Sequence, residues 1–373
     1  MNHLRAAAKL NRKLLFLLSV ATLLFFVDGL THRALATDVS GTLSSVTTWS
    51  AAGSPYVVTG SVLVSSGVKL TIEAGVEVRF NSGKSLQVSG ELIARGTSGS
   101  KITFTSAQES KVAGDWGQIV FYDSSVDATF DGDYASGSIL EYCTVEYGSG
   151  ILLNLGNSFI NQSTIRYHSG TGIRQSTDWY AGTAILKITN NVISNNTSSG
   201  DGGGIKLYWW GSNAAVISGN TISNNTSGGN GGGIEADVGS AIISGNTIEN
   251  NKADANGRGG GIKGRDTGTQ ILNNIIKGNQ AIEGGGIAGG GTVTGNTIIA
   301  NTAERGGGIY STDNPMPISN NYILNNTASS HSGGIFADAG EITITGNVIS
   351  GNSSGNKGGA IDLRVGSEGN ISN

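Results

Sequence analysis

Short apolar segments rich in Ile and Val alternate along the chain with stretches of Gly, Asn, Ser and Thr. Segments of two to five residues are too short for helices and suit β-strands. They recur every 22–29 residues, and internal repeats of that length indicate a solenoid. Leucine-rich, ankyrin and tetratricopeptide repeats need a helix-length segment, which this pattern lacks. The sequence therefore predicts an all-β, right-handed parallel β-helix of about a dozen coils, each with three short strands.

The repeat contains the pattern Asn-x-Ile-x-x-Asn, which occurs seven times after position 188. The first Asn is Asn191, Asn220, Asn246, Asn274, Asn296, Asn321 and Asn347. The Ile is Ile193, Ile222, Ile248, Ile276, Ile298, Ile323 and Ile349. The second Asn is Asn196, Asn225, Asn251, Asn279, Asn301, Asn326 and Asn352. A glycine-rich stretch then leads to a second Ile: Ile205, Ile234, Ile262, Ile287, Ile309, Ile335 and Ile361.

Stacked coils explain these fixed positions. An Ile in each coil would pack on the equivalent Ile above and below it, and so form a core that one coil cannot bury alone. The Asn residues would occupy tight turns, where Asn tolerates left-handed backbone geometry, and would bond one another along the axis. The glycines before the second Ile would allow positive φ or close approach of neighbouring backbones.

Two earlier coils carry substituted versions of the same pattern. Cys143 and Ser163 align with Asn191, and His168 falls where later coils have the second Asn. We expect a buried structural thiol and a turn histidine, because a catalytic Cys–His pair would need two side chains that these different positions keep apart.

The first 36 residues predict a secretory signal peptide. Basic residues before position 14 are followed by an apolar run, Leu14–Val27, and by the small-residue site Ala34-Leu35-Ala36. An uncleaved membrane anchor is the alternative, but the apolar run is shorter than a span of about 20 residues. We therefore expect export and cleavage near Ala36, an amino-terminal cap over residues 37–60, and a β-helix over residues 61–373 that ends within a coil.

Composition narrows the possible partners. Cleavage after Ala36 removes five basic residues and one acidic residue, so the net charge moves from −4 to −8. Nucleic acid is excluded as a partner because its binding needs a basic surface. The single cysteine, Cys143, excludes a disulfide within the chain, so rigidity must come from the stacked coils.

Three early segments resemble the amino-terminal coils of bacterial right-handed β-helix proteins of the pectate-lyase-like superfamily: Val62–Phe80, Ser85–Phe104 and Gly114–Phe121. The stretch Asn301–Ile309 is similar to the repeats of polymorphic outer-membrane and adhesin-type proteins. The resemblance covers about residues 56–373. The resemblance is specific for the fold. It says little about activity, because the superfamily contains lyases, hydrolases, epimerases and non-catalytic adhesins.

Two outward rows next to the glycine-led Ile carry candidate chemistry. The first row is Lys206, Glu235, Lys263, Ala288, Tyr310, Phe336 and Asp362. The second row is Tyr208, Asp237, Arg265, Gly290, Thr312, Asp338 and Arg364. One interpretation is a ladder of opposite charges that stabilises the surface.

The other interpretation of these rows is a site for cleaving uronate polysaccharides. Lys263 or Arg265 would be the base, and Glu235 with Asp237 would hold Ca²⁺. The resemblance does not support this site, because the chain lacks the paired Asp and Gly-His-Gly motifs of polygalacturonases and the Asp-Pro-His-Asp motif of alginate epimerases.

Aromatic residues on the same flank suggest glycan binding. The connection from Ile205 to Ile217 spans 12 residues, whereas Ile234 to Ile243 spans nine. The longer connection holds Tyr208, Trp209 and Trp210, and exposed aromatic faces are natural platforms for sugar rings. The predicted ligand-binding residues are Tyr208, Trp209, Trp210, Lys206, Tyr310 and Phe336.

Asp127, Asp131 and Asp133 cluster in one segment and are candidate Ca²⁺ ligands. Their spacing does not match the twelve-residue calcium loop, so a solvated acidic insertion is the alternative.

Taken together, these features predict an exported or cell-surface protein that binds a polysaccharide or surface glycan without catalysis, like an adhesin. The alternative is a polysaccharide lyase or hydrolase that acts on uronate-containing polymers. Because the chain stops at Gly369–Asn373, where another coil would begin, we expect either a truncated sequence or self-association through an open final coil.

Overall fold

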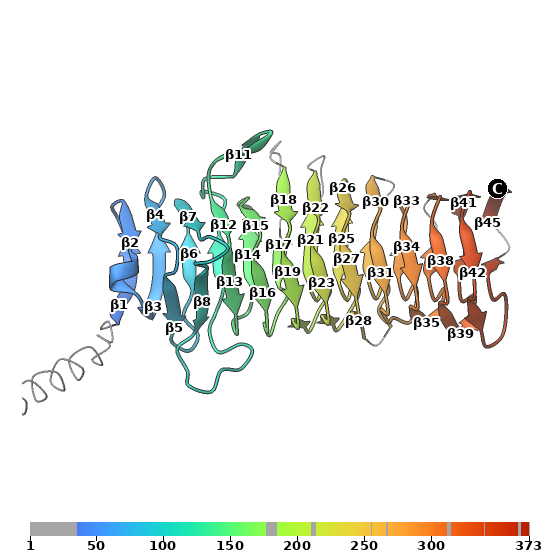
Figure 1. Ribbon diagram of the computed structural model, residues 1–373, viewed down its shortest axis with the longest axis horizontal. Helices are drawn as coiled ribbons and strands as arrows, with labels where there is room; N and C mark the ends of the chain where they lie inside the picture. Colours follow the sequence, from blue (N-terminus) through green and yellow to red (C-terminus); the bar gives the residue numbers. More distant parts are fainter. Residues whose placement is uncertain are drawn as a thin grey trace, which may run out of the picture. The chain divides into compact units, whose positions relative to one another are not determined.

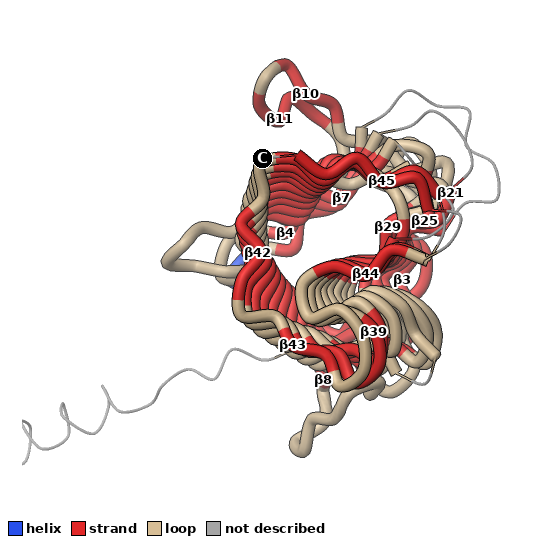
Figure 2. Tube along the Cα trace, turned by 90° about the vertical axis from the view of Figure 1, so that its right-hand side faces the viewer, coloured by secondary structure: helices blue, strands red, loops and turns tan. Residues whose placement is uncertain are grey.

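The computed structural model describes residues 36–176, 185–209, 214–254, 256–265, 268–311, 315–338, 340–364 and 367–372. These residues form one long stack of β-coils (Figure 1). Seen along the axis, the coils lie over one another around a common interior (Figure 2). The right-handed parallel β-helix is confirmed, and one sheet of thirteen stacked strands confirms about a dozen coils. Residues 1–35, which hold most of the predicted signal peptide, lie outside the described residues.

The first face of the solenoid is the thirteen-stranded parallel sheet. Its strands are β2 (Thr47–Trp49), β4 (Lys69–Ile72), β7 (Glu91–Arg95), β12 (Ile139–Glu141), β15 (Phe159–Asn161), β18 (Leu186–Thr189), β22 (Ala215–Ser218), β26 (Ala241–Ser244), β30 (Thr269–Leu272), β33 (Thr292–Thr294), β37 (Met316–Ser319), β41 (Gly340–Thr345) and β45 (Ser367–Ser372).

A second face, here called the ladder face, contains the strands that carry the Asn-x-Ile pattern. Its strands are β5 (Glu77–Phe80), β8 (Ile102–Ser106), β13 (Cys143–Glu146), β16 (Thr164–Arg166), β19 (Val192–Ser194), β23 (Thr221–Ser223), β27 (Thr247–Glu249), β31 (Ile275–Lys277), β34 (Thr297–Ile299), β38 (Tyr322–Leu324) and β42 (Val348–Ser350).

The third face, here called the groove face, begins each strand at or near the glycine-led Ile. Its strands are β6 (Leu86–Val88), β9 (Ile119–Phe121), β14 (Ile151–Asn154), β17 (Ile173–Ser176), β21 (Ile205–Trp209), β25 (Ile234–Val238), β29 (Ile262–Gly264), β32 (Ile287–Gly289), β36 (Ile309–Ser311), β40 (Ile335–Ala337) and β44 (Ile361–Leu363).

The long strands β1 (Thr37–Leu43) and β3 (Tyr56–Val64) join the ladder face and the groove face into one sheet. The first half of β3 pairs with β5 and the second half pairs with β6. Residues 37–60, expected as a cap, include β1, which is already hydrogen-bonded in parallel to β3 like the later coils. At the other end, β45 pairs with β41, and self-association through this coil stays a prediction.

The remaining elements are short. Short strands between the ladder face and the groove face form two three-stranded sheets: β20 (Thr197–Ser198), β24 (Thr226–Ser227) and β28 (Lys252–Ala253), then β35 (Thr302–Arg305), β39 (Thr327–His331) and β43 (Ser353–Ser354). One 3-10 helix covers Ala51–Gly53, and β10 (Thr129–Asp131) with β11 (Asp133–Ser136) forms an antiparallel hairpin. In the described part of the chain, no helix is long and apolar enough to cross a membrane.

The Ile stacks predicted from the repeat form the core. On the ladder face, Ile222 pairs in register with Ile193 and with Ile248, and all three are fully buried. On the groove face, Ile234 lies between Ile205 and Ile262 in the same way. Their strands alternate inward and outward side chains, so repetition at one position extends the apolar interior from coil to coil.

The predicted Asn ladders are also confirmed. Asn246 illustrates the contacts: its Nδ2 donates to Asn274 Oδ1 at 2.9 Å and to the carbonyl of Ile217 at 2.9 Å. Its Oδ1 accepts from the backbone N–H and the Nδ2 of Asn220, both at 2.9 Å. The ladder Asn residues from Asn191 to Asn326 are buried, so the amides replace water as partners for the turn backbone.

The expected source of left-handed geometry was wrong in one respect. Positive φ belongs to the residue immediately before each ladder Asn, for example Asn190 (57°), Asn250 (55°) and Gly245 (63°). The ladder Asn itself is free to point its amide inward, because its neighbour makes the turn. The sequence interpretation assigned both the left-handed turn and the ladder hydrogen bonds to the ladder Asn. In the structure, the preceding residue makes the turn and the ladder Asn makes the hydrogen bonds.

The glycines before the second Ile allow close approach of successive coils, as predicted. A Cβ placed on Gly233 would lie 2.6 Å from the carbonyl oxygen of Gly261 in the next coil. Gly233 also donates its backbone N–H to Gly260 at 3.0 Å, so the glycine-rich turns stack directly.

Candidate functional site

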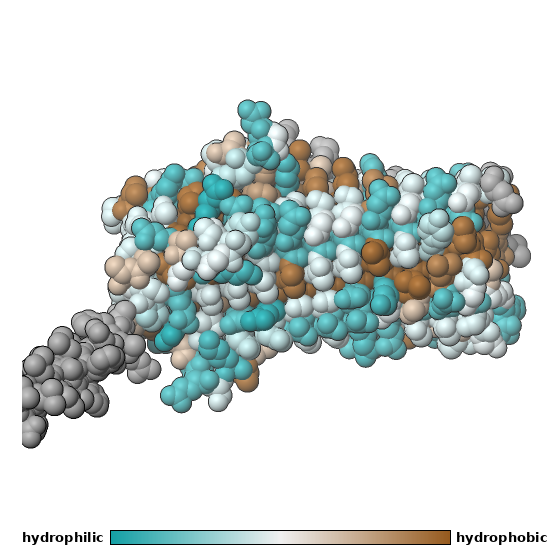
Figure 3. Space-filling model, in the orientation of Figure 1, coloured by the Kyte–Doolittle hydropathy of each residue, from teal (hydrophilic) through white to brown (hydrophobic). Residues whose placement is uncertain are grey.

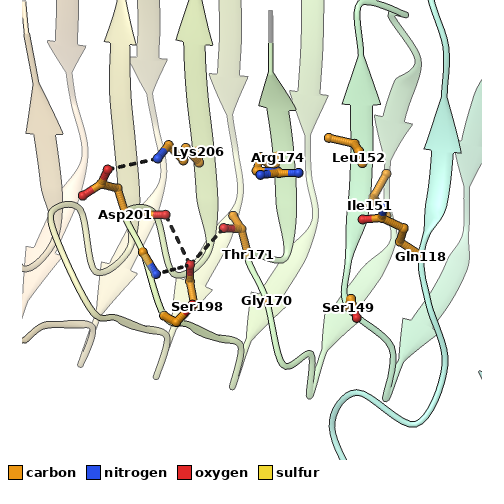
Figure 4. A pocket seen from close by; sticks show the side chains of 12 residues that line it. Gln118, Ser149, Ile151, Leu152, Gly170, Thr171, Arg174, Ser198, Asp201 and Lys206 are labelled. Carbon is orange, nitrogen blue, oxygen red and sulfur yellow. Dashed lines mark hydrogen bonds and ion pairs between the residues drawn. The ribbon is translucent and has the colours of Figure 1, made fainter. Parts of the chain in front are cut away.

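A polar cavity of about 350 Å³ lies beside the groove face, between its outward side chains and the turns that precede its strands (Figure 4). Its side chains come from several successive coils. The lining residues are Gln118, Ser149, Ile151, Leu152, Gly170, Thr171, Arg174, Ser198, Ser199, Gly200, Asp201 and Lys206. We call this cavity the groove site.

Two cations lie next to each other in the groove site. Arg174 on β17 and Lys206 on β21 occupy paired positions of adjacent strands. Lys206 Nζ lies 3.0 Å from Asp201 Oδ2. Arg174 is exposed and makes no hydrogen bond or ion pair with another described residue, so its charge remains available to a ligand.

The surroundings of Asp201 favour its ionised form. Burial alone would raise the pKa of Asp201, but hydrogen bonds from the backbone of Asn230 and from Lys206 outweigh it and lower that pKa. The Asn230 N–H donates to Asp201 Oδ1 at 2.9 Å. Asp201 therefore neutralises Lys206 and leaves Arg174 as the uncompensated cation of the groove site.

Hydroxyl groups complete the groove site. Ser198 Oγ accepts from Gly200 N–H at 3.2 Å and from Thr171 Oγ1 at 3.4 Å. Gln118 and Ser149 add an amide and a hydroxyl on the neighbouring coils. Such groups can both donate and accept, which suits a ligand that carries many hydroxyls.

Glu235 is the next residue in the same outward row and has an unusual environment. It is 5% exposed, and within the described residues its Oε2 has no hydrogen-bond partner. Burial raises the pKa of Glu235 to about 8, although the positive charge of Lys263 opposes the shift. The side chain is therefore mostly a neutral acid at pH 7.

The predicted uronate-cleaving arrangement is not supported by the contacts. Lys263 Nζ donates to the carbonyl of Gly264 at 2.7 Å, and Arg265 forms an ion pair with Asp237 at 2.7 Å. A neutral Glu235 is a poor Ca²⁺ ligand. The described residues contain no group of three His, Cys, Asp or Glu side chains that could hold a metal, and calcium binding here stays a prediction.

The ladder-of-charges interpretation holds for the second outward row. Asp237 pairs with Arg265 of the following coil, and Asp338 pairs with Arg364 at 2.9 Å. In the first row, the cation Lys206 pairs with the turn residue Asp201 instead of with Glu235. The first row is therefore the one whose charges are open to another role.

Two of the predicted ligand-binding aromatics are covered. Tyr310 is 2% exposed and Phe336 is fully buried, and together with Ala288 they form a small separate core. The guanidinium of Arg364 lies 5.0 Å from the ring centroid of Phe336. The expectation that these rings form an open platform was wrong, because the charged turns fold over them.

The other predicted aromatics, Tyr208, Trp209 and Trp210, lie where the described residues end at position 209. Tyr208 occupies the outward position of β21 that pairs with Asp237. The backbone of Trp209 ends β21, whereas Trp210 lies outside the described residues. Their role in binding stays a prediction.

The aspartates proposed as Ca²⁺ ligands lie at the root and the tip of the β10–β11 hairpin. Asp127 Oδ1 accepts the backbone N–H of Asn157 at 2.7 Å and anchors the root of the hairpin. Asp131 and Asp133 face each other across the hairpin tip. Among the described residues they belong to no group of three or more side chains that could hold a metal, and calcium binding at these aspartates stays a prediction.

Cys143 and His168 occupy ladder positions, as expected. The backbone N–H of Ser163 donates to Asn191 Oδ1, and that of His168 donates to Asn196 Oδ1. Burial raises the pKa of the Cys143 thiol and lowers the pKa of His168 to about 4, so both side chains are neutral. They are structural members of the two ladders.

Arg174 and Asp201 were missed in the sequence. Gly172-Ile173-Arg174 aligns with Gly204-Ile205-Lys206, and this alignment would have extended the first row to Arg174. Asp201 belongs to a turn outside the repeat pattern, so no periodic signal identifies it.

The fold and this row of outward polar side chains define a pectate-lyase-like β-helix. Residues 41–151 match the family described as a pectate-lyase like beta helix domain, and residues 132–303 and 203–373 match the right handed beta helix region. The chain belongs to the right-handed β-helix family.

Solved structures of low sequence identity share the fold. A variant of the periplasmic alginate epimerase AlgG matches with 13% identity and a TM-score of 0.56, over 89% of this chain and 84% of that chain. Another structure of AlgG matches with 12% identity and a TM-score of 0.50 over the same shares. No curated protein sequence matches this chain.

Proposed function

We propose that the chain binds an acidic polysaccharide in the groove site. The observation that carries this proposal is Arg174, an exposed cation with no partner among the described residues, set among the hydroxyl and amide groups of adjacent coils. A carboxylate on a sugar would pair with Arg174 in a bidentate contact, and the sugar hydroxyls would bond to Ser198 and Gln118.

The repeating architecture suits a polymer. Equivalent outward positions on successive coils are separated by about 4.8 Å, so a linear ligand can meet a similar set of groups on each coil. The shared fold of AlgG, a protein named for alginate, supports a polysaccharide as the class of ligand. The segment from Tyr208 to Trp210 directly follows Lys206 and is proposed to add aromatic contacts.

Isothermal titration calorimetry with alginate, polygalacturonate and neutral dextran tests the proposal. We expect the two uronate polymers to bind and dextran not to bind. Arg174→Gln should weaken the uronate affinity by about tenfold or more, the loss expected for one charge-assisted contact. Lys277→Gln is the matched control, because Lys277 is exposed on the ladder face and lines neither cavity. Equal affinities of the Arg174→Gln and parent proteins would refute the proposal.

The aromatic part has a separate test. Replacing Trp209 and Trp210 together with Ala should weaken uronate binding while leaving the melting temperature nearly unchanged. A double variant that binds as tightly as the parent would remove these residues from the proposed site.

Proton transfer on a bound uronate is a second candidate function, favoured by Glu235. Its pKa of about 8 is suited to exchange a proton near neutral pH. In elimination, the carboxylate form of Glu235 would take the C5 proton. The C5–H electron pair would form a C4=C5 double bond as the C4–O bond breaks, and the leaving oxygen would take a proton from water. Lys206 and Lys263 occupy the register positions on either side of Glu235.

Incubation with alginate and polygalacturonate tests this candidate directly. The unsaturated product absorbs ultraviolet light, and Glu235→Gln should abolish its formation without abolishing polymer binding. If the parent protein forms no unsaturated product and causes no change in the uronate proton spectrum, the protein is a binder only, which agrees with the adhesin-like prediction.

The protein is also proposed to be exported. The basic and apolar start of the sequence and the Ala34-Leu35-Ala36 site support cleavage near Ala36 and a location outside the cytoplasm. Expression in a bacterial host followed by fractionation and amino-terminal sequencing tests this. A full-length product in the cytoplasmic fraction would contradict it.

A further inference from the structure

The hairpin β10–β11 interrupts the regular coils and is firmly rooted. Asp127 accepts the backbone N–H of Asn157 through Oδ1 at 2.7 Å, and the N–H of Ala128 donates to the carbonyl of Asn157 at 3.0 Å. The N–H of Ser138 donates to the carbonyl of Val126 at 2.9 Å and closes the base. The hairpin projects from the solenoid in Figure 1, and the corresponding projection in Figure 3 is hydrophilic.

Aromatic contacts fold the hairpin against the thirteen-stranded sheet. Phe130 meets Phe159 of β15 edge to face, with ring centroids 5.2 Å apart and planes at 88°. Tyr134 stacks on Phe159 at 6.0 Å and 17°. Strands on both sides of the hairpin thus contribute to one aromatic cluster, which holds the hairpin over the sheet.

A cavity of about 440 Å³ lies between the hairpin and the sheet. Its sheet residues come from five consecutive strands of the stack, β7, β12, β15, β18 and β22. At about 4.8 Å per strand, the floor extends over roughly 19 Å. The cavity belongs to a different face from the groove site, and the two cavities share no residues.

The floor of this cavity carries fixed polar groups. Asn161 Nδ2 donates to Glu141 Oε1 at 2.9 Å, and Thr189 Oγ1 donates to Asn161 Oδ1 at 2.9 Å. Arg95 forms an ion pair with Glu141 at 2.8 Å, and its guanidinium lies 5.3 Å from the centroid of the Tyr134 ring. This chain of contacts runs across four successive coils and orients the hydrogen-bonding groups before a ligand arrives.

Lys187 is the cation of this cavity that has no ion-pair partner among the described residues, whereas Arg95 is paired with Glu141. Its Nζ lies 3.8 Å from the centroid of the Phe130 ring, and no carboxylate of a described residue forms an ion pair with it. An ammonium group held over an aromatic ring and beside a polar floor can pair with an anion that brings its own apolar surface. A sugar ring with an acidic substituent has both features.

We propose that this cavity is a second glycan site, which binds an acidic sugar unit between the hairpin and the sheet. The apolar ring face of the sugar contacts Phe130 and Tyr134, its carboxylate or sulfate pairs with Lys187, and its hydroxyls bond to the polar groups of the floor. The site is separate from the groove site and does not depend on the function proposed for it.

Calorimetry on the mature chain with short oligosaccharides tests the second site. The probes are a galacturonate tetrasaccharide, a sulfated galactose tetrasaccharide and a neutral galactose tetrasaccharide. We expect an acidic probe to bind, and the stronger of the two acidic probes identifies the preferred anion. Lys187→Gln should weaken that binding by about tenfold or more at the second site, while Lys277→Gln leaves it unchanged.

Phe130→Ala tests the aromatic contact, and it should weaken binding of the acidic probe at the second site. Since this change also removes hairpin packing, Lys187→Gln decides the outcome because it leaves the aromatic cluster in place. An acidic probe that binds Lys187→Gln as tightly and with the same stoichiometry as the parent overturns the second site, as does the absence of binding by both acidic probes.

The two proposals can fail independently. If Arg174→Gln leaves all binding intact while Lys187→Gln removes it, the hairpin cavity stands and the groove site fails. If Arg174→Gln removes all binding while Lys187→Gln has no effect, the groove site stands and the hairpin cavity is overturned.

Discussion

In each turn of the ladder face, two adjacent residues have different structural roles. The ladder Asn satisfies buried backbone groups with its amide, and the preceding residue takes the left-handed conformation; it is Asn or Gly in the repeats except for Ala300 before Asn301. Early coils use other residues for both tasks: Tyr142 and Tyr167 have positive φ before Cys143 and His168. The ladder position thus accepts different side chains as long as they can be buried in neutral form.

The first residue-scale prediction concerns His168. Its pKa is about 4 in the folded protein and 6.5 in the unfolded chain, because the ring is fully buried. The unfolded state binds more protons between these values, so stability is complete above pH 6.5 and falls as the pH drops toward 4. The loss should reach about 3 kcal/mol.

Urea unfolding between pH 4 and pH 8 measures this loss. His168→Asn restores the residue used in later coils and should remove the part of the pH dependence that comes from His168. An unchanged pH profile in His168→Asn would show that the histidine does not cause the acid destabilisation.

The second residue-scale prediction concerns Glu235 and has the opposite sign. Its folded pKa of about 8 exceeds the unfolded value of 4.5, so the folded state binds the extra proton in this window. Its contribution to stability is complete below pH 4.5 and is lost as the pH rises through 8. Glu235→Gln should therefore flatten the decline between pH 4.5 and 8, as measured by thermal unfolding. A decline that persists unchanged in Glu235→Gln would place its origin elsewhere.

At the scale of elements, each strand is held by equivalents in the preceding and following coils. The strands contain only two to nine residues, and none of them could bury a core alone. Registers are kept by pairs of identical residues, such as Ile222 with Ile248 and Asn220 with Asn246. A change in one coil should therefore be felt in both neighbours.

Asn246→Ala tests the ladder. The change leaves the buried backbone N–H of Asn220 and the carbonyl of Ile217 without their partners. Each unsatisfied group costs about 1–3 kcal/mol, so the free energy of unfolding should fall by about 2–6 kcal/mol. Chemical denaturation measures this value, with exposed Asn356→Ala as the control. A loss no larger than that of the control would show that the ladder contributes little to stability.

Ile248→Ala tests the apolar stack. The side chain is fully buried between Ile222 and Ile276, and its truncation leaves a cavity. The expected loss is about 2–5 kcal/mol. The neighbouring Thr247 points outward, and Thr247→Ala should change stability by less than about 0.5 kcal/mol. Similar losses for the two variants would mean that inward and outward positions have been exchanged.

At the scale of the whole molecule, two separate cavities lie on different faces of one solenoid. Residues 37–373 carry a net charge of −8, so an anionic polymer is repelled at long range and attracted only near cations such as Arg174 and Lys187. The solenoid surface in Figure 3 is mostly hydrophilic or neutral, with limited apolar areas. Binding should therefore depend on local contacts more than on the overall field.

This charge distribution predicts an unusual salt dependence. Salt screens the long-range repulsion, so the association rate constant for a uronate oligosaccharide should rise between 10 and 150 mM salt. The dissociation rate constant should rise as well, because the contact with Arg174 is weakened. Stopped-flow measurements at several salt concentrations separate the two rates. An association rate that falls with added salt would show that local cations dominate the approach.

The sequence by itself determined the fold, the two Ile stacks and the two Asn ladders. It could do so because the spatial neighbours of a residue in a solenoid are its equivalents one repeat away. The same reasoning placed Cys143 and His168 correctly, and it ordered the outward row from Lys206 to Asp362 as the strand register has it.

The tertiary structure alone decided which outward residues are covered. Tyr310 and Phe336 are buried by charged turns, Glu235 is enclosed although it lies in an outward row, and the hairpin folds over the first face. These outcomes depend on turns and insertions that break the repeat, such as the segment holding Asp201 and the segment 127–137. The periodicity of the sequence determines whether a side chain points into or out of the solenoid. The path of the non-repeating segments determines whether an outward side chain is covered and which residues contact it.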